Sequence, residues 1–319
     1  MTDLPAISGP LPWQAELWAH LVQRVARDQL PHALLLGGVR HTGKSQLALA
    51  LARLLLCHEP DDGHNCGRCH ACNLSRAGSH GDFRYLEPAP KSRVIKIEQI
   101  RQVVEFANMT ASLGRRKVVV LAPADAMNAN AANAFLKVLE EPSADTHMIL
   151  VCDRLQGLPA TVRSRCQLLI MPLPSREHSL TWLDPITGSR QHSEALMTLA
   201  DNRPLLAEQF YKEASIEDAK TRRGVLEALS RGQISGQQLA AALVNLSFDD
   251  ALGEITGQLQ RNIRAMDRGQ LSSRRSRSLF ELLDRVGNLQ RAVENGANPN
   301  RQLIMDTVAA QFHLQLGNA

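Results

Sequence analysis

The sequence predicts an α/β amino-terminal domain with a parallel sheet, followed by a small helical domain and an all-helical carboxyl-terminal domain. Short aliphatic runs alternate with helical stretches up to about residue 170, as in βαβ units. After Arg165 the texture of the sequence changes: Pro172 and Pro174 interrupt the chain, and no strand-like run follows them. The remaining sequence spaces its apolar residues by three and four, which is typical of helices. A chain of 319 residues also exceeds the usual size of a single hydrophobic core.

Each aliphatic run of the first domain is apolar on both faces, as the buried strands of a parallel sheet are. These predicted strands are Ala33 to Gly37, Lys117 to Ala122, Met148 to Cys152 and Leu168 to Met171. Helices are expected between them at Ser45 to Cys57, Ile97 to Met109 and Asn130 to Glu140. The alternation predicts helices on both faces of the sheet, in a domain over residues 1–170.

The helical part is expected to divide into residues 171–213 and 214–319. The second of these contains an apolar series at helical spacing, made of Leu279, Leu282, Leu283, Val286 and Leu289. The segment SSRRSRS at 272–278 is expected to be a solvated loop.

Composition restricts the function classes. Hydrophobic residues make up 44% of the chain and charged residues 21%, as in folded globular proteins. Aromatic residues, at 4%, are too few for base stacking to be the main mode of nucleic-acid binding, and a net charge of +4 does not indicate such a partner by itself. The sequence begins without a secretory signal, and no apolar run approaches the roughly 18 residues of a membrane span. We therefore expect a cytoplasmic protein that has no membrane partner.

Residues 38–45 read GVRHTGKS, the complete GxxxxGK[ST] pattern of a phosphate-binding loop. The pattern lies between a predicted strand and a predicted helix, which is the context that such a loop requires. Gly38 and Gly43 would let backbone N–H groups approach the phosphates. Lys44 would reach the β- and γ-phosphates, and Ser45 would bind Mg²⁺ at the start of the helix. The alternative is a chance match in a turn.

Phosphoryl transfer on such a loop also needs an acidic residue at the end of a neighbouring strand to hold the metal ion. The run that starts at Lys117 has Ala122 and Pro123 where an acidic pair would follow. Asp125 stands further along, where strand geometry would not place it against the same metal. The sequence leaves the binding of ATP and Mg²⁺ open and predicts that hydrolysis is absent or very slow.

Four of the six cysteines lie within 16 residues: Cys57, Cys66, Cys69 and Cys72. Four thiolates at this spacing indicate a closed, tetrahedral Zn²⁺ site with a structural role. Disulfides are not expected in the cytosol, and a redox CxxC pair does not need two further cysteines. His58, His64 and His70 are competing ligands. Cys152 and Cys166 lie in or beside apolar runs and are expected to be buried thiols.

Together these residues resemble the bacterial clamp-loader ATPases of DNA polymerase III, an AAA+ family in which a zinc module follows the helix of the phosphate loop. The resemblance includes HALLLGG at 32–38, NAFLKVLEEP at 133–142, SRC at 164–166 and NRQLIMD at 300–306. Between about 175 and 295 it consists only of length and helical texture. It implies an AAA+ type first domain with a zinc module at 57–72, a helical lid, and a carboxyl-terminal domain for oligomerisation.

Motor subunits of this family (gamma/tau) keep the acidic pair, so the resemblance implies that this chain is of the non-hydrolysing type. His41 occupies a loop position that is glycine in many motor subunits. LADNRPLLA at 199–207 resembles only loosely the segment that carries a nucleotide-sensing arginine, with Pro204 at that place and Arg203 beside it. The implied partners are the motor subunits, the delta subunit and, through the complex, the sliding clamp and primer-template DNA.

The arginine of the SRC motif is Arg165, and the resemblance implies that it enters the ATP site of an adjacent motor subunit. There a guanidinium would neutralise charge on the transferred phosphoryl group. Without the other motifs, Arg165 would be interpreted as an ordinary surface arginine. Glu140 and Glu141 are adjacent and point to different helix faces, so a capping or interface role is expected rather than acid/base chemistry.

Two alternatives stay open. The chain could be an ATP-hydrolysing motor subunit, and the missing acidic pair is the feature that argues against it. It could also be a zinc-dependent regulator that binds nucleic acid, but Arg68 and Arg76 alone do not form the dense basic face that this function needs. Although the complex belongs to a nucleotidyltransferase, no polymerase or ATPase activity is expected of the isolated chain.

Overall fold

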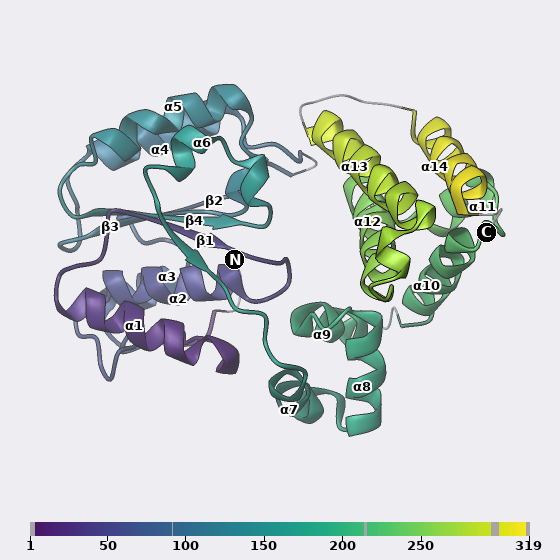
Figure 1. Cartoon of the computed structure of the whole chain (residues 1–319). Helices are drawn as coiled ribbons and strands as arrows, with labels where there is room; N and C mark the ends of the chain where they lie inside the picture. Colours follow the sequence, from purple (N-terminus) through teal and green to yellow (C-terminus); the bar gives the residue numbers. More distant parts are fainter. Residues whose placement is uncertain (1–3, 91, 214–215, 295–299, 317–319) are drawn as a thin grey trace. The chain divides into compact units, whose positions relative to one another are not determined.

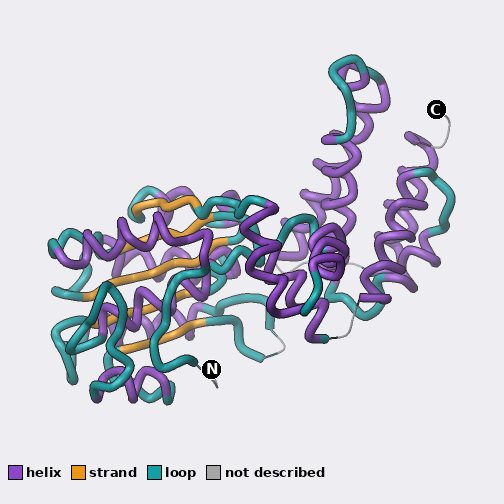
Figure 2. Tube along the Cα trace, turned by 90° about the horizontal axis from the view of Figure 1, so that it is seen from below, coloured by secondary structure: helices purple, strands orange, loops and turns teal. Residues whose placement is uncertain are grey.

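The computed structural model describes residues 4–90, 92–213, 216–294 and 300–316. The chain forms two compact units, Met1–Glu208 and Gln209–Ala319, and the boundary falls within helix α9 (Pro204–Lys212). All strands formed by the described residues belong to the first unit (Figure 2). No helix in this described part of the chain is long and apolar enough to cross a lipid bilayer.

The first unit contains a five-stranded sheet (Figure 1). In spatial order its strands are β2 (Phe83–Leu86), β3 (Lys117–Leu121), β4 (Thr146–Cys152), β1 (Ala33–Gly37) and β5 (Gln167–Ile170). Every adjacent pair is parallel. Because β1 lies between β4 and β5, the loop after Gly37 leaves the carboxyl edge of the sheet between two neighbouring strands. Ligands of open parallel sheets bind at this edge.

Helices cover both faces of the sheet (Figure 1). One face carries α1 (Ala15–Ala26), α2 (Lys44–Leu56) and α3 (His70–Arg76). The other carries α4 (Ile97–Asn108), α5 (Ala129–Glu140) and α6 (Ala160–Arg163). Side chains of β1 alternate between the two cores: Leu34 and Leu36 pack with residues of α1 and α2, and Leu35 packs with residues of α4 and α5. The predicted α/β domain with helices on both faces is confirmed.

Short helical segments connect these layers and continue the unit. Three are 3₁₀ helices, η1 (Pro12–Gln14), η2 (Ala124–Ala126) and η3 (Leu155–Gly157). After the sheet come α7 (Arg176–Thr187), α8 (Arg190–Leu199) and α9. The rings of Trp13 and Trp182 meet edge to face at 5.5 Å, so η1 contacts α7.

Two strands differ from the sequence prediction. β5 was expected to be buried on both faces, but it is an edge strand that pairs with β1 alone, and Leu168 and Ile170 are 45% and 57% exposed. Its aliphatic composition therefore does not reflect burial in this chain. β2 lacks an aliphatic run altogether: it reads FRYL and occupies the opposite edge, where Arg84 can face solvent.

The second unit is helical, as expected. It contains α10 (Ile216–Ser230), α11 (Gly236–Ala242), α12 (Phe248–Arg264), η4 (Gln270–Ser272), α13 (Arg274–Glu294) and α14 (Arg301–Leu316). The predicted apolar series lies on α13, and Leu279, Leu282 and Val286 are buried in the core of the unit.

The segment at 272–278 was expected to be a loop, but most of it is the first turn of α13. Ser273 precedes the helix, and its Oγ accepts a hydrogen bond from the backbone N–H of Ser276 at 3.2 Å. Such a bond satisfies one of the unpaired donors at a helix start. The serine of an apparently polar run therefore begins a helix.

Candidate nucleotide site and metal centre

The phosphate loop connects β1 to α2, and its glycines adopt conformations that other residues disfavour. Gly43 precedes α2 with a φ of 90°. A Cβ atom at Gly43 would lie 2.3 Å from Cδ1 of Leu11 and 2.7 Å from Nε2 of Gln14. Only glycine therefore fits this position.

The 3₁₀ helix η1, which precedes α1, donates hydrogen bonds to the backbone of this loop. The side-chain amide of Gln14 donates to the carbonyl oxygens of Thr42 and Gly43, at 3.1 and 3.0 Å. The indole N–H of Trp13 donates to the same Thr42 oxygen at 3.0 Å. These contacts fix the backbone at the start of α2. No motif in the sequence indicates that Trp13 and Gln14 belong to the site.

His41 occupies the middle of the loop with a φ of 64°, in the left-handed region that glycine favours. Burial, together with the charges of Arg40 and Arg203, lowers the pKa of His41 to about 4. The ring is therefore neutral at pH 7 and adds no positive charge to a phosphate site. The effect of Arg203 also shows that this arginine lies near the loop.

Lys44 and Ser45, the two side chains expected to contact a nucleotide or its Mg²⁺, interact with other residues of this chain. The Lys44 ammonium lies 2.7 Å from Oδ1 of Asp153, which directly follows β4, and the Lys44 side chain is 3% exposed. It also donates to the carbonyl oxygens of Gly38 and Val39, at 2.9 and 2.6 Å. The hydroxyl of Ser45, the expected Mg²⁺ ligand, lies near the Tyr85 side chain of β2: burial raises the pKa of Tyr85, and the nearby Ser45 hydroxyl partly opposes this.

No carboxylate follows directly on β3 toward the phosphate loop. Ala122 and Ala124, on either side of Pro123, are both buried. Asp125 lies in η2, and its carboxylate accepts a hydrogen bond from the backbone N–H of Asp153 at 3.0 Å and interacts with Nε of Arg154 at 3.4 Å. The Asp125 carboxylate is therefore engaged in holding the end of β4.

Asp153 and Tyr85 are site residues that the sequence analysis missed. Neither belongs to a motif, and each reaches the loop from a different strand of the sheet. Only the position of Asp153 in the sequence could have indicated its role, because it directly follows a predicted strand. Side chains at the carboxyl ends of parallel strands gather at one edge of the sheet.

The four cysteines predicted to bind zinc converge on one point. Cys57 directly follows α2, Cys66 and Cys69 lie in the following loop, and Cys72 lies in α3. Their sulfur atoms all lie within 4.8 Å of one another, with separations of 3.6, 3.9 and 4.0 Å for three of the pairs. Zn–S bonds of about 2.3 Å place the sulfurs of a tetrahedral site about 3.8 Å apart. The donor set and its geometry therefore fit a zinc ion.

The thiols differ in their surroundings. Hydrogen bonds from the backbone of Arg68 and Cys69 lower the pKa of Cys66 to about 6, whereas burial raises the pKa of Cys57 to about 12. A bound Zn²⁺ would supply the positive charge that deprotonates such a buried thiol. Backbone N–H donors to sulfur, such as Cys69 N to Cys66 Sγ at 3.4 Å, would orient the ligands.

A buried arginine connects this module to the rest of the unit. Arg53 of α2 is 2% exposed and donates to the carbonyl oxygens of Pro5 and Ala6 and to the hydroxyls of Ser8 and Ser75, at 2.6 to 3.3 Å. The same guanidinium therefore joins α2, the amino-terminal segment and α3. Zinc binding in this module is consequently expected to affect the stability of the first unit.

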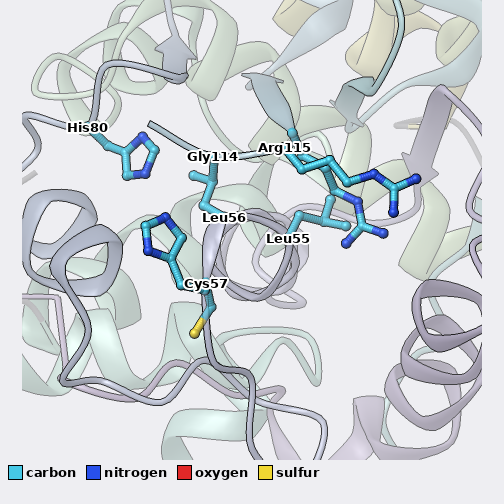
Figure 3. Close-up of a pocket in the computed structure, with 8 residues that line it drawn as sticks. Leu55, Leu56, Cys57, His80, Gly114 and Arg115 are labelled. Carbon is cyan, nitrogen blue, oxygen red and sulfur yellow. The ribbon is translucent and has the colours of Figure 1, made fainter. Parts of the chain in front are cut away.

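A cavity of about 260 Å³ lies beside Cys57 (Figure 3). Its lining comprises Leu55, Leu56, Cys57, His58, His80, Gly114, Arg115 and Arg116. His80 precedes β2 and Gly114 precedes β3, so the cavity lies at the amino edge of the sheet. The phosphate loop lies at the carboxyl edge. This cavity is therefore separate from the candidate nucleotide site.

Arg165 follows α6 and is not directed to the phosphate loop of its own chain. Its guanidinium lies 2.6 Å from Oε1 of Glu140, at the end of α5, and donates to the carbonyl oxygen of Thr161 at 3.0 Å. The side chains of Arg165 and Glu140 are 37% and 49% exposed. Arg165 is thus accessible to a partner molecule.

The chain has an AAA+ type fold. Its sheet is parallel, the phosphate loop follows the inner strand β1, and helices follow β5. A solved structure of a DNA polymerase III gamma subunit-related protein from Thermotoga maritima has a similar fold, with a TM-score of 0.50 and 16% identity. The match covers 93% of this chain and 99% of that one.

Sequence comparisons identify the family more narrowly. The family model described as "DNA polymerase III, delta subunit" matches residues 13–174. DNA polymerase III subunit delta' of Pseudomonas aeruginosa is 35% identical over 320 residues, covering 94% of this chain and 96% of that protein. Subunit tau of Escherichia coli K12 is 27% identical over 78% of this chain, but only 37% of its own length is covered. The chain belongs to the delta-prime family of DNA polymerase III subunits, which confirms the resemblance found in the sequence.

Proposed function

We propose that this chain is a non-hydrolysing subunit of the sliding-clamp loader of the DNA polymerase III holoenzyme, working in the cytoplasm during DNA replication. In this role it acts as a scaffold and supplies Arg165 to the ATP site of a neighbouring motor subunit of the gamma/tau type. The observation that supports it most directly is the end of β3. Ala122 and Pro123 stand where hydrolysis needs a metal-binding carboxylate, and Asp125 is engaged with the end of β4.

The exposure of Arg165 supports its role as an arginine finger. Ion pairs between exposed side chains contribute only about 0–1 kcal/mol, so the contact with Glu140 can be exchanged at little cost. A neighbouring nucleotide site presents a denser negative charge than one carboxylate. The guanidinium can contact two phosphate oxygens at once, which a lysine ammonium cannot do with the same geometry.

The remaining roles follow from the same proposal. Residues 1–170 form the AAA+ type domain, 171–213 a lid, and 214–319 the oligomerisation domain that joins the subunit to the motor subunits and to the delta subunit. The zinc module at 57–72 is structural. The sliding clamp and primer-template DNA are reached through the complex.

The test is Arg165→Ala in a reconstituted clamp loader. We expect ATP hydrolysis stimulated by DNA and clamp to fall at saturating ATP, with little change in ATP affinity, because a finger acts mainly on the transition state. Single arginine fingers contribute about 10³ to 10⁵ in rate at the site that they complete. Arg165→Lys should restore little. The measurements are steady-state hydrolysis and clamp loading.

Arg101→Ala is the matched control, because Arg101 is an exposed arginine on α4 of the same unit. It should leave hydrolysis unchanged, and both alanine variants should keep the parental zinc content and assemble normally. A complex containing Arg165→Ala that hydrolyses ATP and loads clamps like the parent would exclude the finger role.

The complete loop motif at 38–45 favours a second candidate, an ATP-hydrolysing motor subunit. Steady hydrolysis by the isolated chain, abolished by Lys44→Ala, would support that candidate. The absence of a carboxylate directly after β3 argues against it.

A further inference from the structure

The ammonium group of Lys44 has each of its hydrogen-bond donors engaged within the chain. A lysine carries three such donors. Their acceptors are the carbonyl oxygens of Gly38 and Val39, at 2.9 and 2.6 Å, and Oδ1 of Asp153, at 2.7 Å. Because the Lys44 side chain is 3% exposed, water hardly competes for these contacts. A phosphate oxygen could bind this group only by replacing one of them.

Asp153 is the acceptor that a phosphate would have to replace. It follows β4, which pairs directly with β1, so its side chain lies at the edge of the sheet from which the phosphate loop leaves. The backbone N–H of Asp153 donates to Oδ1 of Asp125 at 3.0 Å, and Asp125 is 8% exposed. A buried residue therefore fixes the position of Asp153 against Lys44. The Asp153 carboxylate provides the negative charge that a nucleotide phosphate provides in an active loop.

We propose that Asp153 occupies the phosphate position of this loop and excludes nucleoside di- and triphosphates, so that it is the residue that determines nucleotide affinity. A nucleotide must either separate a largely buried ion pair or place its phosphates beside the Asp153 carboxylate, and both oppose binding. The inference rests on the proposed function and adds that the subunit stays free of nucleotide although its motif is complete.

Two further residues of the loop, Ser45 and His41, also disfavour nucleotide binding. The hydroxyl of Ser45, which would bind the Mg²⁺ that accompanies a nucleotide, lies close enough to the Tyr85 side chain to lower the pKa of that phenol, against the larger effect of burial, which raises it. The ring of His41 is neutral at pH 7 and does not attract phosphate. Arg40, the other basic residue of the loop, lies with its Nε 3.9 Å from Oδ2 of Asp153, so its charge already faces the same carboxylate.

The test is equilibrium binding of Mg·ATP and Mg·ADP to the full-length chain, measured by titration calorimetry. Asp153→Asn keeps the size of the side chain and removes its charge. We expect it to bind Mg·ATP at least tenfold more tightly than the parent, which corresponds to roughly 1.4 kcal/mol. Adding Lys44→Ala should abolish this gain. Glu98→Gln is the matched control, because Glu98 is an exposed acid on α4, and it should bind like the parent.

Asp153→Thr, with a shorter uncharged side chain, provides the same test if the asparagine variant does not fold. The proposal is overturned if a folded variant binds Mg·ATP no better than the parent, or if the parent itself already binds it at low micromolar concentration. Hydrolysis of ATP by Asp153→Asn would instead refute the proposed function and leave the role of Asp153 intact. Tighter binding without hydrolysis supports both.

Discussion

Replacing one cysteine of the zinc module should reduce both zinc content and the stability of the first unit. The parent chain, purified under reducing conditions without chelator, is expected to contain about one zinc per molecule, because its four sulfurs lie at separations that fit one tetrahedral ion. Cys69→Ser removes one thiolate and leaves three. The remaining ligands should bind the ion more weakly, because a serine hydroxyl stays protonated near neutral pH.

The size of the effect follows from linkage between metal binding and folding. Changing only a hydrogen-bond partner of a zinc ligand costs about 10- to 100-fold in affinity, so loss of a ligand should cost at least about 100-fold. When the parent site is saturated, that loss lowers the free energy of unfolding by about 2.7 kcal/mol. A unit of this size, Met1–Glu208, changes its melting temperature by about 2–4 °C per kcal/mol. Cys69→Ser should therefore melt roughly 5–10 °C below the parent.

The assay combines metal analysis with thermal melting at a fixed concentration of free zinc. Cys166→Ser is the matched control: Cys166 is outside the four-sulfur group, burial raises its pKa to about 11, and its replacement should leave the zinc content unchanged. Excess zinc should partly restore the melting temperature of Cys69→Ser. A parent chain without zinc, or a Cys69→Ser variant that keeps both its zinc and its melting temperature, would refute this reasoning.

Two further predictions concern other groups of the first unit. The pKa of His41 is about 4 in the fold and about 6.5 in an unfolded chain, so the unfolded state binds the extra proton first, and stability is lost as pH falls from about 6.5 to about 4. Measured by denaturant unfolding, the free energy of unfolding of the parent should fall by up to about 3 kcal/mol over this pH range, and that of His41→Gln should fall less. Identical pH profiles for the two proteins would contradict the lowered pKa of His41. Asp82→Asn should cost about 2–4 kcal/mol at pH 7, because one carboxylate oxygen accepts from the N–H and hydroxyl of Ser112 and the other from the N–H groups of Leu113 and Gly114. An amide has only one oxygen and can accept from only one of these pairs of donors. An unchanged denaturation midpoint would show that the Asp82 carboxylate does not stabilise the loop at residues 112–114.

The sheet could be predicted where burial and composition agree. Strands β1, β3 and β4 are covered on both faces, and their aliphatic runs end within two residues of the observed bounds. The same rule fails at both edges. Ile170 of β5 is aliphatic yet 57% exposed, and Arg84 and Tyr85 of β2 give that strand no aliphatic pattern. Composition reports what a strand could bury, whereas its place in the sheet decides what it does bury.

The candidate sites show a similar division. The phosphate loop and the four cysteines could be found because their residues are close in sequence and keep fixed spacings. The proximity of Asp153 to Lys44 and of Tyr85 to Ser45 could not be predicted, because these residues are distant in sequence and are brought together only by the order of the strands in the sheet. Arg165 could be located by its motif, but its ion pair with Glu140 depends on how α5 and α6 pack.

These contacts give the residues of the phosphate loop a structural role that does not require nucleotide. Gly43 is favoured because its φ of 90° is strained for any residue with a side chain, and a Cβ there would also displace the side-chain ends of Leu11 and Gln14. The Lys44 ammonium contacts the carbonyl oxygens of Gly38 and Val39 and the carboxylate of Asp153, and so joins the phosphate loop and the start of α2 to the end of β4. Removing Lys44 would leave the carboxylate of Asp153 and two carbonyl groups without this donor, which is costly for partly buried groups. A complete GxxxxGKS motif is therefore compatible with a subunit that neither binds nor hydrolyses ATP, since the fold itself uses Gly43 and Lys44.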